Sequence, residues 1–133
     1  MLFRSDSEKM NSMQAGCIRA EDVYEFVKSP IGQRIKEAVK KNNVRREQPF
    51  MFEYDRQLVQ GVIDLYIIED DKIVLVDYKT DRVKKGKAGE QELIRRYSVQ
   101  LDYYALALVQ LTGLEVKEKI IYSFALGKQI SLE

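Results

Sequence analysis

The chain has 133 residues, 45% of them hydrophobic, which is the length of one domain and supplies enough apolar material for a single core. Its net charge of +1 excludes a protein whose whole surface is basic, so any attraction to nucleic acid must come from local patches. The apolar runs are strand-sized and interrupted by charge, which argues against a membrane span or a signal peptide and predicts a cytoplasmic location. Residues 1–20 lack a clear apolar period and are expected to be partly ordered, leaving a single domain over residues 21–133.

Two helices are predicted before the first strand. The first covers about residues 21–28. The second covers 30–41, with Ser29 as N-cap and Pro30 at the first helical position. Its buried stripe is expected to consist of Ile31, Ile35, Ala38 and Val39.

Three antiparallel strands are expected next, followed by a long helix and a last strand. The strands cover residues 45–54, 58–68 and 72–78, which are rich in β-branched and aromatic residues, with an acidic hairpin turn at 69–71. A loop over residues 80–89 leads to a helix from about 90 to 111, and residues 119–126 return as a strand. The order of elements predicts an α/β fold with a mixed central sheet flanked by helices.

Two carboxylates and a lysine fall on neighbouring strands of this sheet: Asp64 in one strand, and Asp77 and Lys79 at the end of the next. Side chains two apart on a strand share a face, so Asp77 and Lys79 point the same way, and Asp64 can face Asp77 across the hairpin. Two carboxylates make an incomplete oxygen shell for Mg2+, and an adjacent ammonium can orient a water or stabilise charge on a phosphate. The pattern indicates metal-dependent phosphodiester cleavage.

The same three residues have a plainer interpretation. Asp77 and Lys79 can form a solvent-facing pair on an edge strand, with Asp64 a turn residue at a strand end. For the bare pattern, this alternative is favoured.

Three segments in fixed order make the pattern more specific: residues 58–64 (LVQGVID), 74–82 (VLVDYKTDR) and 97–104 (YSVQLDYY). Together they resemble the RecB-like branch of the PD-(D/E)XK nucleases, whose core is restriction-endonuclease-like. Within that branch the chain is most like the C-terminal nuclease domain of the AddA subunit of bacterial ATP-dependent helicase/nucleases, and the resemblance covers most of the chain.

The resemblance implies roles for single residues. It makes Asp64 and Asp77 the metal-binding carboxylates and Lys79 the catalytic lysine, with Tyr78 a metal ligand through its backbone carbonyl. Glu47 matches a recurrent acidic position in the preceding strand, whose role is less settled.

Gln100 and Tyr104 match the family's Gln-x-x-x-Tyr motif, which contacts DNA or supports the catalytic site. They lie four apart on the long helix, on roughly one face. Tyr104 also belongs to an apolar stripe that would pack on the sheet, so it is as well explained as a core residue. The members of that stripe are Ile94, Tyr97, Leu101, Tyr104, Ala105 and Leu108.

Two basic clusters are candidates for phosphate contact, although such runs are often only solvated. One surrounds the end of the second helix and consists of Lys36, Lys40, Lys41, Arg45 and Arg46. The other follows Lys79, and because it adjoins the expected metal site, Arg82, Lys84 and Lys85 are predicted to bind DNA together with Gln100. Thr80 and Asp81 are expected to shape this loop through side chain to backbone hydrogen bonds.

The resemblance implies a Mg2+- or Mn2+-dependent deoxyribonuclease of the exonuclease type, with single-stranded DNA as its substrate. It further implies a place in a larger helicase/nuclease for double-strand break repair and recombination, where the partner is an AddB-like second subunit. No Gly-x-x-x-x-Gly-Lys-[Ser/Thr] loop occurs in the sequence, so ATP is expected to act only through a helicase part outside this chain.

The chain departs from the family pattern in one respect. The family carries a metal-binding His on a helix upstream of the first core strand, and this chain contains no His. A fragment that begins after that helix is expected. The alternative is a catalytically silent module of the same fold that binds DNA or a partner.

Overall fold

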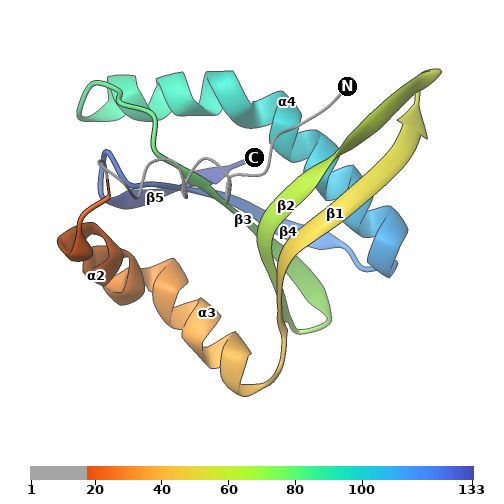
Figure 1. Cartoon of the computed structure of the whole chain (residues 1–133), viewed down its shortest axis with the longest axis horizontal. Coiled ribbons are helices and arrows are strands. Elements are labelled where there is room, and N and C mark those ends of the chain that lie inside the picture. The colour runs from red at the N-terminus through yellow and green to blue at the C-terminus, as the bar shows by residue number, and fades with distance from the viewer. Residues whose placement is uncertain (1–17) are drawn as a thin grey trace.

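The computed structural model describes residues 18–133, which form a five-stranded mixed sheet with helices on both faces (Figure 1). The elements are α2 (Ala20–Lys28), α3 (Pro30–Lys40), β1 (Val44–Tyr54), β2 (Gln57–Glu69), β3 (Lys72–Lys79), α4 (Lys87–Thr112), β4 (Val116–Ser123) and β5 (Lys128–Leu132). The predicted α/β fold, a restriction-endonuclease-like mixed sheet flanked by helices, is confirmed. Of the segment expected to be partly ordered, residues 1–17 lie outside the described part.

The strands follow one another across the sheet in chain order. β1, β2 and β3 form an antiparallel meander, as predicted. β4 pairs parallel to β3, which requires a crossover, and α4 provides it. β5 then pairs antiparallel to β4 through a turn in which Gly127 has a φ of +65°.

Each face of the sheet has its own apolar core. On one face α4 packs against β1–β3 and the last two strands, with Phe52, Val59, Ile63, Tyr66, Ile73, Leu75, Leu93, Leu101, Tyr104, Ala107, Leu108, Ile121 and Ile130 buried. On the other face α3 covers Leu65, Ile67, Val74, Val76, Ile120 and Tyr122. The expected stripe of α3 is buried at Ile31, Ile35 and Ala38, but Val39 is 51% exposed because only a narrow face of this helix meets the sheet.

The corner between α2 and α3 depends on a close backbone approach. Ser29 caps α3 by accepting a hydrogen bond from the N–H of Gly32 at 3.1 Å, and Pro30 occupies the first turn, as predicted. A Cβ atom on Gly32 would lie 2.1 Å from the carbonyl oxygen of Phe26. The absence of a side chain at Gly32 therefore lets the two helices touch.

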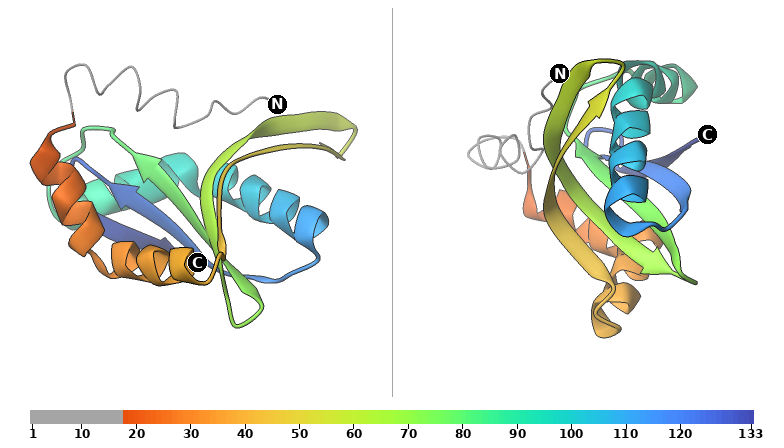
Figure 2. Two further views of the ribbon diagram at one scale, coloured as in Figure 1. Left: turned by 60° about the horizontal axis from the view of Figure 1, so that its bottom comes forward. Right: turned by 90° about the vertical axis from the view of Figure 1, so that its right-hand side faces the viewer.

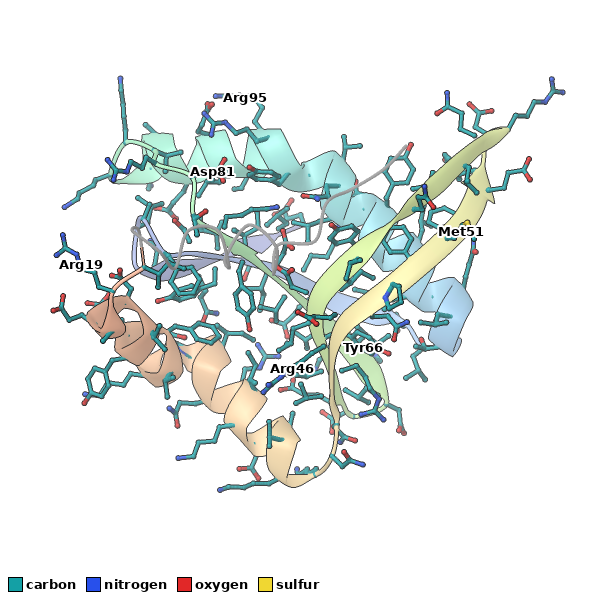
Figure 3. The ribbon with its side chains drawn as sticks, in the orientation of Figure 1. Arg19, Arg46, Met51, Tyr66, Asp81 and Arg95 are labelled. Atoms are coloured by element: carbon teal, nitrogen blue, oxygen red, sulfur yellow. The ribbon has the colours of Figure 1, made fainter. Side chains whose placement is uncertain are left out.

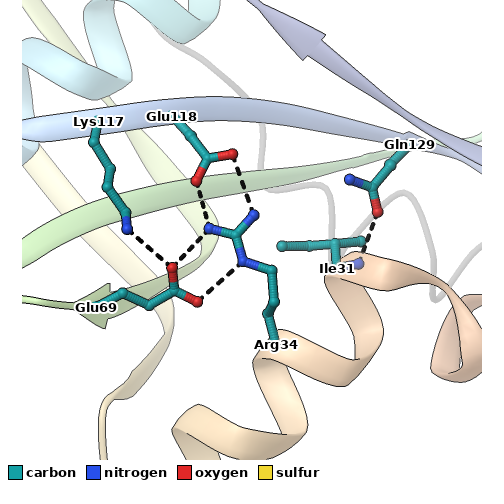
Figure 4. A network of polar contacts seen from close by, with 6 residues as sticks. All are labelled: Ile31, Arg34, Glu69, Lys117, Glu118 and Gln129. Atoms are coloured by element: carbon teal, nitrogen blue, oxygen red, sulfur yellow. Dashed lines mark hydrogen bonds and ion pairs between the residues drawn. The ribbon is translucent and has the colours of Figure 1, made fainter.

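An ionic network fastens α3 to the sheet (Figure 4). Arg34 donates to Glu69 at the end of β2, at 2.7 and 3.0 Å, and also to Glu118 in β4. Lys117 adds a 3.1 Å ion pair to Glu69. The Arg34 guanidinium, with help from Lys117, lowers the pKa of Glu69 to about 2.

The outer half of the β1–β2 hairpin leaves the plane of the sheet and bends over α4 (Figure 2). Aromatic contacts hold it there, since the ring of Phe50 lies 5.4 Å from that of Tyr104. The pairing of β2 with β3 accordingly ends at Leu65 opposite Val76. β2 and β3 therefore separate just where Asp64 and Asp77 lie.

Within residues 18–133, no helix is both long and apolar enough to cross a membrane.

Candidate active site

Asp77 and Lys79 lie on the face of β3 that is covered by α4, as the two-residue period of a strand requires. Both are buried, Asp77 at 0% and Lys79 at 1% exposure. The Nζ of Lys79 is 2.9 Å from Oδ2 of Asp77. The alternative of a solvent-facing pair on an edge strand is therefore wrong, because β3 is a central strand and the pair lies beneath a helix.

Asp64 lies at the point where β2 separates from β3. Its Oδ2 accepts a 2.9 Å hydrogen bond from the N–H of Tyr78, so the carboxylate takes the place of the next rung of the ladder. Continuing the register of Leu65 with Val76 by one residue places Asp64 opposite Asp77. Asp64 is 3% exposed and is a strand residue, not a turn residue.

Tyr78 contributes its backbone to this gap and its side chain to the opposite face. The N–H and C=O of one strand residue point to the same neighbour, so the Tyr78 carbonyl faces the side on which Asp64 lies. The ring packs edge-on to Phe26 with centroids 5.3 Å apart. Burial, and after it the charge of Asp64, raises the pKa of Tyr78 to about 12.

Gln100 and Tyr104 reach the pair from α4. Oε1 of Gln100 accepts a 3.0 Å hydrogen bond from Nζ of Lys79, and its Nε2 donates to the hydroxyl of Tyr104 at 2.9 Å. All three side chains are buried. Tyr104 is thus both a core residue and the group that fixes which way the Gln100 amide points.

Three further residues complete the surroundings of Lys79, and none of them was assigned this place from the sequence. The ring centroid of Tyr97 lies 3.9 Å from Nζ of Lys79. The Tyr97 hydroxyl donates to Oδ2 of Asp81 at 2.5 Å, and Arg96 donates to the same oxygen at 3.0 Å. Burial, reinforced by the bond to Asp81, raises the pKa of Tyr97 well above its usual range.

A spacing argument was available for these contacts. Residues 77, 79 and 81 follow the period of a strand, and residues 97, 100 and 104 follow one helical face. Asp81 was expected to shape its loop through backbone contacts, whereas its described bonds run to side chains of α4. Figure 3 shows Asp81 on the segment between β3 and α4, and Arg95 pointing outward from that helix.

The predicted DNA-binding residues Arg82, Lys84 and Lys85 are exposed on the segment that leads from β3 to α4. Arg82 and Lys84 line one surface pocket together with Arg95 and Arg96 of α4. This pocket lies on the same side of the sheet as Lys79, because Arg96 also binds Asp81. The segment is held to the helix by backbone contact, since a Cβ on Gly89 would lie 1.7 Å from the carbonyl oxygen of Lys84.

Glu47 lies on β1 at the position facing Asp64. The register pairs Arg46 with Leu65 and Gln48 with Ile63, and the rung between them, Glu47 with Asp64, is not formed. Glu47 has a φ of +48°, uncommon for a residue with a side chain, and its side chain is exposed.

The chemistry of the donor set suits a hard divalent cation. Asp64 and Asp77 bring two carboxylates to one buried place, where Lys79 supplies a single ammonium, so one negative charge is left over if all three are ionised. Among residues 18–133, no group of three or more His, Cys, Asp or Glu side chains gathers around a common point. Two carboxylates with a backbone carbonyl match Mg2+, which retains several water ligands, better than Zn2+, which takes a closed set of protein ligands at structural sites.

Comparison with known proteins agrees with this geometry. The family model described as the PD-(D/E)XK nuclease superfamily matches residues 14–130. The chain belongs to this superfamily. The crystal structure of SSO0001 aligns with 98% of this chain and 66% of its own, with a TM-score of 0.48 and 15% sequence identity.

Within the PD-(D/E)XK superfamily, the chain is similar to bacterial proteins named as the AddA-type subunit of an ATP-dependent helicase/nuclease. The protein from Clostridium novyi (strain NT) is 39% identical over 96% of this chain, and that from Lachnoclostridium phytofermentans is 61% identical over 59% of it. These alignments cover only 11% and 6% of the two relatives. The predicted resemblance to the nuclease superfamily and to AddA is thus confirmed, and the chain corresponds to a small part of those proteins.

Proposed function

We propose that the chain is a nuclease domain that hydrolyses phosphodiester bonds of DNA with the help of a divalent metal ion. The observation that carries the proposal is the buried group of Asp64, Asp77 and Lys79, at the one place where β2 and β3 separate. Burying charged side chains is unfavourable unless they are paired and bonded, so their placement in the core calls for a chemical role. A pair that served only solubility would lie on the surface.

Asp64, Asp77 and the carbonyl of Tyr78 would hold the ion, which would be Mg2+ or Mn2+. When bound, such an ion supplies charge neutralisation at the phosphate and a more acidic water. Lys79 holds its protons on Nζ between Asp77 and Gln100, which aims a positive charge at one side of the carboxylate pair. From there the ammonium would orient the attacking water or stabilise the charge that develops on the phosphate.

Arg82, Lys84 and Lys85 would bind the DNA backbone on the way to the site, with Gln100 at the inner end. Their support is position, because they follow Lys79 directly and share a pocket with Arg95 and Arg96. Following the relatives' names, we place the chain in an ATP-dependent helicase/nuclease that acts in double-strand break repair and recombination. In that setting it would act as an exonuclease on single-stranded DNA, and its partner would be an AddB-like second subunit. The helicase part would account for any use of ATP.

A cleavage assay tests the proposal. The protein is mixed with end-labelled single-stranded DNA in Mg2+, in Mn2+ and in EDTA, and three variants are compared with wild type: Asp64→Asn, Asp77→Asn and Lys79→Met. We expect metal-dependent cleavage that falls at least about a hundredfold in each variant. Asp71→Asn makes the same chemical change in the exposed turn before β3 and should cleave like wild type.

The second candidate is a module of the same fold that binds DNA without cutting it. The observation in its favour is that the sequence contains no His, whereas the family pattern includes one as a metal ligand. Metal-dependent binding of DNA without any cleavage by wild type would select this candidate. Cleavage that persists in all three site variants would refute the proposed active site.

A further inference from the structure

The ring of Tyr97 covers the Lys79 ammonium on the side of α4. Nζ lies 3.9 Å from the ring centroid, within the range in which the face of an aromatic ring attracts a cation. Lys79 is 1% exposed, so little water screens this attraction. The ring therefore contributes both an electrostatic contact and part of the cover that keeps solvent away from the ammonium.

A second contact fixes the ring itself. The Tyr97 hydroxyl donates to Asp81 at 2.5 Å, and Arg96 holds the same carboxylate oxygen at 3.0 Å. Asp81 lies two residues beyond Lys79 on extended backbone, so both side chains face α4. The position of the ring is thus tied to the segment that carries the lysine.

A lysine needs such support because its ammonium ends a flexible four-carbon stem with large rotamer freedom. Asp77 and Gln100 hold Nζ at 2.9 and 3.0 Å. In the proposed function, Asp77 must also serve a metal ion, and its hold on Nζ then weakens. The contacts from α4, through Gln100 and Tyr97, do not depend on the ion.

We propose that Tyr97 is a positioning residue for Lys79, with its ring holding the ammonium in place and Asp81 holding the ring. This inference rests on the proposed function for its catalytic consequence. The contact itself does not, so the two can be tested separately.

The first test is structural and needs no cleavage. Protons on the Cε of a lysine above a tyrosine ring are shifted upfield by the ring current, and two-dimensional NMR of the full chain resolves them. We expect an upfield Lys79 signal in wild type and in Tyr97→Phe, and its return toward the ordinary lysine position in Tyr97→Leu. Tyr103→Leu removes another half-buried tyrosine of α4, one that packs on Tyr54, and should leave the signal in place.

The second test is kinetic. Tyr97→Leu should lower kcat for DNA cleavage about tenfold with little change in KM, and Tyr97→Phe should recover most of the loss because it keeps the ring. Asp81→Asn should fall between the two. Tyr103→Leu should cleave with the kcat of wild type.

The outcomes separate the inference from the proposed function. If wild type cleaves and Tyr97→Leu matches it, or if Tyr97→Phe is as impaired as Tyr97→Leu, the positioning role is overturned while the nuclease stands. A Lys79 signal that does not move in Tyr97→Leu also overturns it. Wild type that cuts no DNA while the Lys79 signal moves as expected overturns the proposed function and supports the contact.

Discussion

Lys79 is a charge held inside the protein by its neighbours. Its ammonium and the Asp77 carboxylate are 2.9 Å apart and almost fully excluded from solvent. Removing one member of such a buried pair leaves an uncompensated charge, whereas replacing both by neutral side chains is often tolerated. Stability should therefore depend on the two residues jointly.

A double-mutant cycle measures this dependence. Asp77→Asn and Lys79→Met should each lower the free energy of unfolding by about 3 kcal/mol, as for other broken buried pairs. The double variant should lose less than the sum of the singles by at least about 2 kcal/mol, measured by urea unfolding in EDTA. The same cycle on Asp102 and Lys119, a pair 2.7 Å apart whose aspartate is 61% exposed, should give a coupling below about 1 kcal/mol. Additive losses at Asp77 and Lys79 would contradict this account.

At this scale the sequence predicted the face shared by Asp77 and Lys79, because that depends only on the two-residue period of a strand. It did not predict that the face is buried, since burial depends on where α4 crosses the sheet. The role of Tyr97 was missed for a related reason: an aromatic residue in an apolar helical stripe is predicted to be core. Only the three-dimensional contact shows that its ring meets a charge.

Among the elements, α3 depends on charge for its attachment to the sheet. The pKa of Glu69 is lowered from its ordinary value of 4.5 to about 2 by Arg34, and Arg34 also lowers the pKa of Glu118. A carboxyl group with a lowered pKa stabilises the fold above its unfolded pKa and loses that contribution as the pH falls toward the folded value. The stabilisation should be complete above about pH 4.5 and should disappear toward pH 2.

Arg34→Met tests the network. At pH 7 the variant should be less stable than wild type by about 1–2 kcal/mol, allowing for the partial exposure of the pair. The difference should shrink as the pH is lowered from 4.5 toward 2, as followed by thermal unfolding at a series of pH values. Lys40→Met removes a cation from an exposed 3.7 Å pair with Glu37 and should change stability little at any pH. A gap between Arg34→Met and wild type that is independent of pH would mean that packing, not charge, fastens α3.

The contact between α2 and α3 gives a steric prediction. A Cβ at residue 32 would lie 2.1 Å from a backbone oxygen of α2, so Gly32→Ala must move the helices apart. We expect a loss of about 2–4 kcal/mol in unfolding free energy, comparable to severe overpacking. Lys36→Ala, on the exposed side of the same helix, is the control for helix propensity. A Gly32→Ala protein as stable as wild type would show that the helices can separate freely.

The last two strands mark the limit of the sequence prediction for elements. One strand was expected over residues 119–126, whereas β4 ends at Ser123 and β5 begins at Lys128. Phe124, Ala125 and Leu126 continue the apolar run through the turn, so periodicity gave no sign of a break there. The turn is fixed by tertiary and local bonds, including the one from the N–H of Leu126 to the Ser123 hydroxyl.

For the whole molecule, the net charge of +1 means that binding to DNA must rely on where the charges lie. Replacing Arg82, Lys84 and Lys85 by Gln should weaken binding of single-stranded DNA and reduce the salt dependence of log K by about 2, as counterion release predicts. Fluorescence anisotropy over a range of salt concentrations measures both. The matched control replaces Lys36, Lys40 and Lys41 in and after α3. If that control weakens binding more, the DNA path lies on the α3 side of the sheet.

The central claim is that Asp64 and Asp77 form one metal site between β2 and β3. Titration calorimetry with Mn2+ on wild type, Asp64→Asn and the exposed control Asp71→Asn tests it most directly. Asn at position 64 can still accept the hydrogen bond from Tyr78, so the variant changes the charge at the site and little else. We expect wild type and Asp71→Asn to bind alike and Asp64→Asn to bind at least about tenfold more weakly. Equal binding by Asp64→Asn, or no binding by folded wild type, would contradict the account.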